Sequence, residues 1–389
     1  MRVILFTGKG GVGKTTVACA TAVSAARRGE STLVMSTDPA HSLADCLGVE
    51  LNAQASEIEP KLWALQLDAT VRMEQSWLEI RGYLEEVFRW AGLDAIQAEE
   101  LAILPGFEEI FSLTDIHRHA TSGDFDTIVV DCAPTGETIR LLSMPDVLHW
   151  YMDKAFPMSR RVNRAVGPLV ARLTSLPVAD DEVFGAVERL YTQLSSVRDL
   201  LRDPTSSSVR LVTQAEKMVV AEARRTYTYL SLFGYHTDAV IVNRLLPDSM
   251  TDPWFDHWRS SQRDQLTAIT EGFDPLPILH AELSDRELLG AEALHQFAQE
   301  IYGDTDPTAI HFVEEPFELH AEGDVINLTI KLAHVDKSEL DLGRVGDELF
   351  IKVGPYRRAV LLPDSLRRRS VASAKFVGDR LVVGFALAQ

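Results

Sequence analysis

Hydrophobic residues follow two different patterns along the chain. Up to about residue 302, short apolar runs of strand length alternate with longer stretches whose apolar residues recur at three- and four-residue spacing. The first unit is an apolar strand at 2–7, a glycine-rich turn and a helix at 16–28. Further strands are expected at 31–36, 127–130, 209–213, 238–246 and 276–279, and helices over most of 57–123, in 145–206 and 214–234, and at 290–302. This alternation predicts an α/β fold with a mostly parallel sheet and helical insertions.

The pattern changes after a short turn-rich stretch, GDTDP, at 303–307. From about residue 312 the chain shows short alternating strands separated by turn residues, with no helical stretch. Such a series is typical of an all-β sandwich. We therefore predict an α/β domain at 1–303 with a helical subdomain at about 145–206, a linker at 304–311, and a β-sandwich at 312–389.

Composition narrows the class of protein. The 389 residues are 46% hydrophobic, enough for more than one packed domain. The net charge of −19 falls almost wholly on residues 1–307, which argues against nucleic acid as the main partner. The first strand begins at residue 2, leaving no room for a targeting peptide, and no run approaches the ~18 apolar residues of a membrane span. We expect a soluble, cytoplasmic protein without stable membrane insertion.

The segment MRVILFTGKGGVGKTT joins the first predicted strand to the first helix. Its second half fits G-x-x-x-x-G-K-[ST], the phosphate-binding loop, in the strand–loop–helix context that this loop requires. Glycines let backbone N–H groups turn inward, and the helix N-terminus adds its positive end. Lys14 is expected to reach the β- and γ-phosphates, and the Thr15 hydroxyl to bind Mg²⁺. The expected nucleotide contacts are Gly8, Gly10, Gly11, Val12, Gly13, Lys14, Thr15 and Thr16.

Two carboxylates follow buried strands. Asp38 comes after the strand at 31–36, and Asp131 ends the strand at 127–130. Ligands of an open α/β sheet bind at the carboxyl ends of its strands, so both side chains are expected near the phosphates. There Asp38 could orient the attacking water, and Asp131 could join the Mg²⁺ shell. Each also has a purely structural interpretation, Asp38 as the start of an Asp-Pro turn and Asp131 as a strand-end cap.

The loop contains a second lysine, Lys9, directly after its first glycine. The resulting K-G-G-V-G-K-T resembles the deviant phosphate loop of the SIMIBI class of ATPases. T-D-P-A-H-S-L-x-D at 37–45 and D-x-A-P-T-G-x-T-x-R at 131–140 resemble switch I and switch II of the ArsA and tail-anchored-protein targeting ATPases of that class. The resemblance covers 1–302 and implies an ATPase that uses Mg·ATP. It also implies a nucleotide-dependent homodimer in which Lys9 reaches the partner subunit's nucleotide.

The same resemblance assigns further roles. It makes Asp38 the water-positioning carboxylate, with His41 and Asp45 as accessory switch residues. It makes Asn243 the side chain that reads the adenine edge, and it places Pro277 near the adenine pocket. LPGFEE at 104–109 resembles a segment that faces the dimer partner in these families, although alone it predicts only a turn between helices.

Cysteine usage departs from the targeting ATPases. Cys19, Cys46 and Cys132 are the only cysteines, and no two of them form a C-x-x-C pair. The relatives carry their zinc-binding C-x-x-C where this chain has PDSMTDPWFDHWRSSQ. We therefore expect neither a disulfide framework nor a zinc-clamped dimer.

The resemblance also bears on partners. A family member would hold its client in the helices at 145–206, so a hydrophobic or tail-anchored polypeptide is the expected client. Only three methionines, at 144, 152 and 158, lie in or beside this stretch, and ordinary helix packing explains its pattern as well. After residue 312, an L-P at 362–363 and A-x-F-x-x-x-x-L-x-V at 374–383 resemble the α-crystallin domain of small heat-shock proteins, without an I-x-I tail.

Three other functions stay open. One is a chaperone-like binding module with slow ATP turnover. A second is an ATPase that energises arsenite efflux, which would need soft thiolate ligands. A third is a partition-type positioning ATPase, which would need a basic DNA-binding face or an amphipathic membrane helix. The presence of Lys14, Asp38 and Asp131 favours an active ATPase.

Overall fold

The protein is described from a computed structural model. It describes residues 1–38, 42–66, 107–143, 181–314 and 317–387, with five isolated positions between 78 and 85; side chains are not described at 107–111 and 181. The chain divides into two compact units. The first comprises Met1–Leu67, His119–Arg140 and Leu200–Gln389, and it contains every contact discussed below. The predicted client helices lie mainly in the second unit, and most of their residues are outside the described part.

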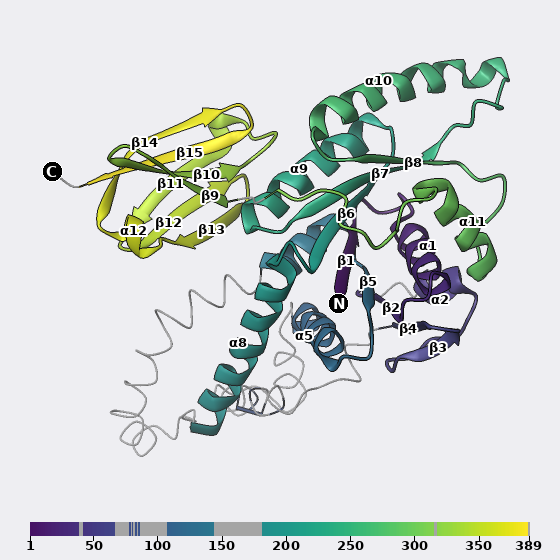
Figure 1. Ribbon diagram of the computed structural model, residues 1–389, viewed down its shortest axis with the longest axis horizontal. Coiled ribbons are helices and arrows are strands. Elements are labelled where there is room, and N and C mark those ends of the chain that lie inside the picture. Colours follow the sequence, from purple (N-terminus) through teal and green to yellow (C-terminus); the bar gives the residue numbers. More distant parts are fainter. Residues whose placement is uncertain are drawn as a thin grey trace. The chain divides into compact units, whose positions relative to one another are not determined.

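An eight-stranded sheet forms the centre of the first unit (Figure 1). The strand order is β3 (Ser56–Glu59), β4 (Leu62–Gln66), β2 (Thr32–Ser36), β5 (Thr127–Asp131), β1 (Arg2–Thr7), β6 (Ser207–Thr213), β7 (Thr237–Leu245) and β8 (Ile278–Glu282). All neighbouring strands are parallel except the edge pair β3–β4. The predicted α/β class with a mostly parallel sheet is confirmed, and the carboxyl ends of seven strands meet at one edge.

Helices cover both faces of this sheet (Figure 1). On one face lie α1 (Lys14–Arg27), α2 (Ser42–Leu47) and α11 (Gly290–Tyr302), whose apolar residues share a core with alternate residues of the central strands. On the other lies α9 (Lys217–Phe233), and the short η1 (Pro253–Phe255) leads into α10 (Asp256–Phe273), which packs against α9. Two further helices of the chain are α5 (Phe107–Ser122) and α8 (Asp181–Arg202). A parallel sheet needs this double cover because both of its faces are apolar.

The structure departs from the sequence prediction at 56–66. This stretch falls in a region predicted to be mostly helical, but it forms β3 and β4. Four of the five β4 residues are buried, and the strand pairs in parallel with β2 from Thr32↔Leu62 to Ser36↔Gln66. Pairing with a distant strand overrides a local pattern in which apolar and charged residues are mixed.

The C-terminal part consists of two antiparallel sheets (Figure 1). One has the order β14 (Arg369–Val377), β15 (Arg380–Leu387), β10 (Val325–Lys331), β9 (Phe317–Glu322), and the other β11 (Leu340–Val345), β12 (Glu348–Val353), β13 (Tyr356–Leu361). Each of the four tight hairpins contains a glycine with positive φ, such as Gly378 at 64° between β14 and β15. The predicted all-β sandwich is confirmed, apart from the one-turn helix α12 (Asp364–Arg367) and the 3₁₀ turn η2 (Lys337–Glu339).

The sandwich packs against the C-terminal half of α9. The rings of Tyr229 and Tyr356 lie 4.5 Å apart, and Phe233 contacts the same Tyr356 ring edge-on at 6.1 Å. Arg358 of β13 donates a hydrogen bond to the Leu232 carbonyl at 2.5 Å. Helix α9 therefore packs against the α/β sheet through β6 and β7 and against the sandwich through its C-terminal residues.

The segment predicted as a linker, 304–311, is held by buried arginines. Arg210 lies on β6, is fully buried, and donates to the carbonyls of Pro307 (2.6 Å) and Ala309 (2.9 Å). Arg2 donates to the Thr308 carbonyl at 3.0 Å. Both guanidinium groups pair with the buried carboxylate of Asp238, at 3.0 Å for Arg2 and 3.2 Å for Arg210. Backbone acceptors thus take up several of the donors that a single carboxylate leaves over, although Nη1 of Arg2 has no hydrogen-bond partner within the described part of the chain.

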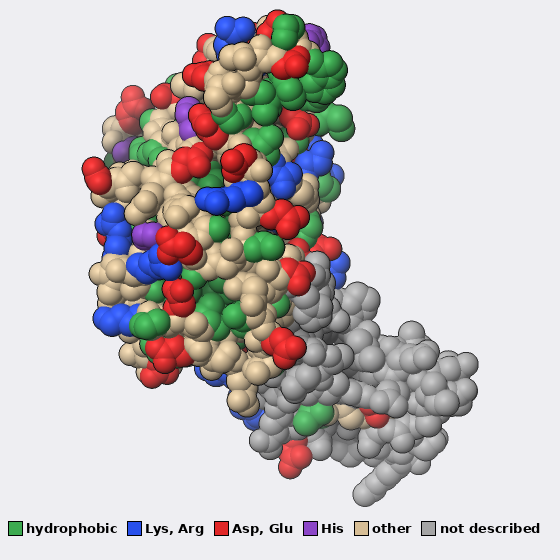
Figure 2. All heavy atoms as spheres, turned by 90° about the vertical axis from the view of Figure 1, so that its right-hand side faces the viewer, with side chains coloured by type: hydrophobic (Ala, Val, Ile, Leu, Met, Phe, Trp, Pro, Cys, Tyr) green, Lys and Arg blue, Asp and Glu red, His purple; other side chains and the backbone are tan. Residues whose placement is uncertain are grey.

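On the described part of the face in Figure 2, acidic side chains lie among the basic ones. Among the helices of the described part of the chain, none combines the length and the apolar character that crossing a bilayer requires.

Asp238 is expected to be the critical member of the buried arginine cluster. Burial alone would raise its pKa, but the charges of Arg210 and Arg2 outweigh burial and hold the pKa below its usual value. Asp238→Asn leaves two buried cations without a counter-charge and should cost about 3–5 kcal/mol of unfolding free energy. Thermal unfolding at pH 7 measures this loss.

Glu292→Gln provides the matched control. Glu292 pairs with Arg27 at 2.8 Å in an exposed setting, so its loss should leave the melting temperature nearly unchanged. Equal effects of the two substitutions would contradict the role given to the buried cluster.

Candidate nucleotide-binding site

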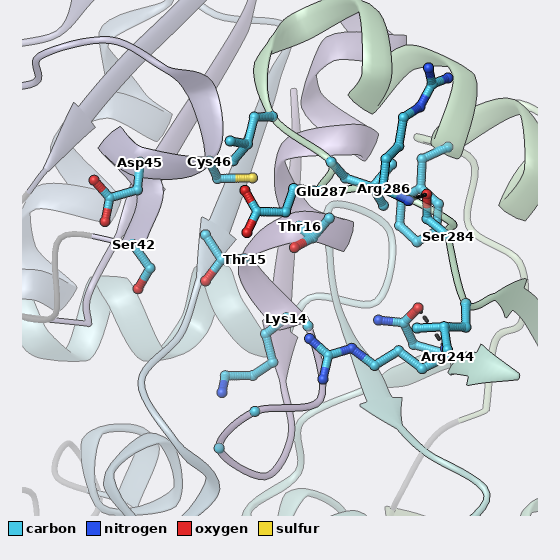
Figure 3. A pocket seen from close by; sticks show the side chains of 18 of the residues that line it. Lys14, Thr15, Thr16, Ser42, Asp45, Cys46, Arg244, Ser284, Arg286 and Glu287 are labelled. Atoms are coloured by element: carbon cyan, nitrogen blue, oxygen red, sulfur yellow. Dashed lines mark hydrogen bonds between the residues drawn. The ribbon is translucent and has the colours of Figure 1, made fainter.

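A cavity of about 710 Å³ lies at the carboxyl edge of the sheet (Figure 3). Its walls come from the loop after β1, the segment after β2, the end of β7 and the connection from β8 to α11. The lining residues are Gly10, Gly11, Gly13, Lys14, Thr15, Thr16, Asp38, Ser42, Asp45, Cys46, Pro134, Asn243, Arg244, Glu282, Leu283, Ser284, Asp285, Arg286, Glu287, Leu288, Leu289 and Phe297. The parallel strand order therefore brings together the predicted loop, Asp38 and Asn243.

Two glycines of the loop after β1 are fixed by close neighbours. A Cβ on Gly8 would lie 2.1 Å from the Val212 carbonyl oxygen, and one on Gly13 would lie 2.3 Å from Nδ2 of Asn243. Gly13 adopts φ 90°, and no side chain caps the N-terminus of α1 that follows. The first N–H groups of α1 are thus left to a ligand, and a helix N-terminus with free amides favours an anion.

Asp131 is buried at the end of β5, with 1% of its surface exposed. Its Oδ2 accepts a hydrogen bond from the Thr15 hydroxyl at 2.7 Å. Its Oδ1 has no hydrogen-bond partner within the described part of the chain. Burial raises the pKa of Asp131 to about 6, although the Thr15 hydroxyl and the Lys14 charge act in the opposite direction. A buried carboxylate with one unsatisfied oxygen, beside a hydroxyl, is an oxygen-rich site of the kind that Mg²⁺ prefers.

Asp38 lines the cavity and is half-buried. Its backbone is held from both sides, because its N–H donates to the Ser36 hydroxyl at 3.1 Å and its carbonyl accepts from Gln66 Nε2 at 3.1 Å. Asp45, on α2, also lines the cavity. His41 lies outside the described residues.

Thr37 connects the two predicted switch segments. Its N–H donates to the Asp131 carbonyl at 2.9 Å, and its hydroxyl accepts from the Ala133 N–H at 3.2 Å. The backbone before Asp38 is therefore tied to the backbone around Asp131. A displacement of either segment would therefore move the other or break these hydrogen bonds.

The two lysines of the loop have different surroundings. Lys14 lines the cavity with 7% of its surface exposed, and its Nζ donates to the Lys9 carbonyl at 3.4 Å. Lys9 does not line the cavity, and its Nζ lies 3.9 Å from a carboxylate oxygen of Glu222 on α9. Glu222 also accepts a hydrogen bond from the Thr135 hydroxyl at 2.5 Å. One carboxylate thus contacts both the loop lysine and the segment after β5.

Asn243 faces the phosphate-binding loop. Its Nδ2 donates to the carbonyl of the buried Val12 at 2.8 Å, and its Oδ1 accepts from the Arg244 N–H at 2.8 Å. Pro277 is not among the cavity-lining residues, and its carbonyl accepts a hydrogen bond from the Val240 N–H within the sheet. The structure therefore brings Asn243, but not Pro277, to the cavity.

Sequence patterns did not identify several residues of this site. Gln66, Glu222 and the 283–289 wall act through tertiary contacts that no motif specifies. A signal did exist for Arg2 and Arg210, because each is a charged residue inside an otherwise apolar strand and must find a buried partner.

Comparisons with known proteins agree with this geometry. A family model described as anion-transporting ATPase matches residues 1–303, and a model described as an HSP20-like domain found in ArsA matches residues 323–385. A provisionally named arsenical pump-driving ATPase of Chlorobaculum tepidum is 38% identical over all of this chain and 96% of its own length. One from Aquifex aeolicus is 37% identical over 98% of this chain and 99% of its own length. The ATPase get3 of Schizosaccharomyces pombe is 28% identical over 75% of this chain and 88% of its own length.

Fold, loop and cavity define a P-loop nucleotide-hydrolysing protein. The chain belongs to the anion-transporting ATPase family, in the group that carries a C-terminal HSP20-like domain. It is an ATPase of that family.

From the burial of the Asp131 carboxylate we predict that its charge lowers the stability of the nucleotide-free protein but is needed for activity. Because its pKa is raised when folded, the folded chain binds the proton more tightly than the unfolded chain. The stability of the nucleotide-free protein should therefore rise as pH falls through about 6 and be lower above it. Asp131→Asn should remove this dependence and raise stability at pH 8 by up to ~3 kcal/mol, while abolishing Mg²⁺-dependent turnover.

Urea unfolding at pH 5 and pH 8, together with an ATPase assay, tests this opposition. Asp124→Asn, in an exposed turn, should change neither quantity. A nucleotide-free Asp131→Asn protein less stable than the native protein at pH 8 would contradict the account.

Proposed function

We propose that the protein is a cytoplasmic, dimeric ATP-driven switch. It hydrolyses Mg·ATP to ADP and phosphate, and this cycle closes and opens two subunits around a hydrophobic polypeptide client. The observation that carries the proposal is the hydrogen bond from the half-buried Thr15 hydroxyl to the buried Asp131 carboxylate, at the end of the phosphate-binding loop. It pairs a hydroxyl with a carboxylate that has an unused oxygen, beside the uncapped N-terminus of α1.

The residues present fit magnesium and ATP. Thr15 and Asp131 would hold Mg²⁺, directly or through water, and the 2.7 Å between their oxygens supports a small ligand shared by both groups. Bound Mg²⁺ would neutralise charge on the phosphate oxygens. Gly8 and Gly13 fix the path of the loop, because each packs against Val212 or Asn243 too closely for a Cβ. A Cβ on Gly10 or Gly11 would meet no described atom within 4 Å, which supports an open approach for a phosphate chain at these two positions.

Asp38 is the group assigned to the attacking water. Its backbone is held by Ser36 and Gln66, which fixes the position from which its carboxylate works. Lys14 supplies positive charge beside the loop, where negative charge develops on the transferred phosphoryl group. Asn243 keeps one N–H and one lone pair beyond its two present bonds, which suffices to read an adenine edge.

Lys9 is the residue assigned to the partner subunit's nucleotide. About a third of its side chain, 36%, is exposed, and its 3.9 Å pair with Glu222 is long enough to be exchanged for a phosphate at small cost. Glu222 also holds Thr135 of the predicted switch II, so release of Lys9 and movement of that loop can occur together. The dimer would form when ATP binds and reopen after hydrolysis.

The client assignment rests on the family resemblance of the sequence and on the amphipathic pattern of the sequence at 145–206, where α8 is a helix of the described part of the chain. Apolar residues along α8, including Ala186, Leu190, Leu194 and Val197, are buried. A chaperone-like module with slow turnover is the first alternative, and slow turnover with firm client binding would favour it.

An arsenite-energising ATPase is the second alternative, favoured by the names of two relatives. Cys46 lines the cavity, and its thiol contacts that of the fully buried Cys19. Burial raises the pKa of Cys19 well above its usual value, which disfavours the thiolate that a soft metalloid would bind. Stimulation of turnover by arsenite would support this alternative.

Asp38→Asn separates binding from hydrolysis. Asparagine keeps the side-chain volume but loses the charge that orients water, so ATP affinity should stay within about threefold and phosphate release should fall about 100-fold or more. Calorimetric titration and a phosphate-release assay measure the two quantities. Asp248→Asn, exposed and outside the cavity, should behave as the native protein. Normal turnover in Asp38→Asn would remove the water-positioning role.

Lys9→Ala tests the dimer. The substitution should leave the monomer folded and abolish the ATP-dependent shift to dimer in sedimentation velocity, because the second subunit loses its contact to the phosphates. Lys9→Arg keeps the charge but changes the shape of the cation, so it should restore the dimer only in part. Lys217→Ala, an exposed lysine at the start of α9, is the control. Unchanged ATP-dependent dimerisation in Lys9→Ala would contradict the proposal.

A further inference from the structure

Arg244 interrupts an otherwise buried strand. Of the nine residues of β7, it is the only exposed one. The pairing of β7 with β8 shifts register between Val242 and Leu245, so the chain contains an irregularity around Arg244. Bulges of this kind re-aim a side chain and are frequent beside ligand sites.

The backbone of Arg244 adopts an unfavourable conformation. Its φ is 57°, in the left-handed region that residues with a Cβ rarely occupy. The neighbouring Asn243 supports this conformation, because its Oδ1 accepts the Arg244 N–H at 2.8 Å. Strain that the surroundings hold in place is typical of a functional position.

The side chain of Arg244 lines the cavity, and its guanidinium has no partner among the described residues. It makes no hydrogen bond or ion pair with any residue in the described part of the chain, yet it lines the nucleotide cavity beside Asn243. In Figure 3 its end is turned towards Lys14. The other arginine of the cavity, Arg286, points away from Lys14 and donates to Gln296 at 3.2 Å.

The charges that line the cavity indicate a role for this guanidinium in binding an anion. The lining includes five carboxylates and only three basic side chains. The five are Asp38, Asp45, Glu282, Asp285 and Glu287. Such a wall repels a polyphosphate unless cations face it, and apart from Arg244 and Arg286 the basic side chain among the lining residues is Lys14. A guanidinium is the side chain best suited to a phosphate because its donors form a fork.

We propose that Arg244 is a nucleotide-binding residue whose guanidinium contacts the phosphate chain of bound ATP or ADP. This inference rests on the proposed function, since it concerns the same cavity. It adds a cationic side chain, supplied by the end of β7, to the contacts made by the backbone N–H groups of the loop and by Lys14. Asn243 then has a second task, which is to hold the backbone of Arg244 in its left-handed conformation.

Four substitutions test the proposal by calorimetric titration of Mg·ATP and Mg·ADP. Arg244→Ala removes the side chain, and Arg244→Gln keeps much of its length but not its charge. Both substitutions should weaken the binding of Mg·ATP and of Mg·ADP about 10-fold or more. Arg244→Lys keeps the charge and should recover part of the affinity. Arg244→Gly should bind as weakly as alanine while melting at or above the native temperature without nucleotide, because glycine accepts the positive φ without strain.

Arg263→Ala, an exposed arginine on α10 outside the cavity, is the control and should bind like the native protein. Native affinity in both Arg244→Ala and Arg244→Gly would overturn the inference while leaving the ATPase proposal intact. Recovery by glutamine but not by lysine would also overturn it, because charge would then be irrelevant. Failure of the native protein and of Arg263→Ala to bind ATP would instead refute the proposed function itself.

Discussion

The carboxylate of Asp131 is the constraint on which the site depends. It is buried at the end of a central strand, and only one of its oxygens is hydrogen-bonded within the described part of the chain. Burying such a group is unfavourable, as its raised pKa shows. A metal ion beside the Thr15 hydroxyl would remove this cost only when nucleotide and metal are present, so the unfavourable burial couples the state of the site to its ligand.

Parallel strand pairing places the segments around Asp131 in contact with one another. The strands β1, β2, β5 and β7 end at one edge, so the loop, Thr37 and Asn243 all lie within hydrogen-bonding reach of their neighbours. Thr37 joins the segments that follow β2 and β5, and Glu222 joins the segment after β5 to Lys9 on the loop. On the far side of the sheet, α9 carries both Glu222 and the aromatic contacts to the sandwich. Helix α9 is therefore in contact with both the site and the C-terminal sandwich.

Local patterns predicted the parts of the structure that depend on local chemistry. The loop at Gly8–Thr15, the β1 and β5 strands and the hairpins of the sandwich each carry their own turn glycines or apolar runs. The β4 strand was missed because its apolar residues follow a stretch rich in charged ones, so the local pattern does not mark a strand, and pairing with β2, as at Thr32 and Leu62, decides the structure instead. Glu222, Gln66 and the left-handed Arg244 could not be predicted because their importance arises from distant segments that the fold brings together. The assigned roles of Asp38, Lys9 and Pro277 remain predictions.

A crystal structure with Mg²⁺, ADP and aluminium fluoride, a mimic of the transferred phosphoryl group, tests the central claim most directly. The account predicts phosphates on the loop from Gly8 to Thr15, with Mg²⁺ bound by the Thr15 hydroxyl and reached by Asp131 directly or through one water. It further predicts the fluoride group beside Asp38. Nucleotide bound away from this cavity, or a metal with no contact to Thr15 or Asp131, would contradict the account.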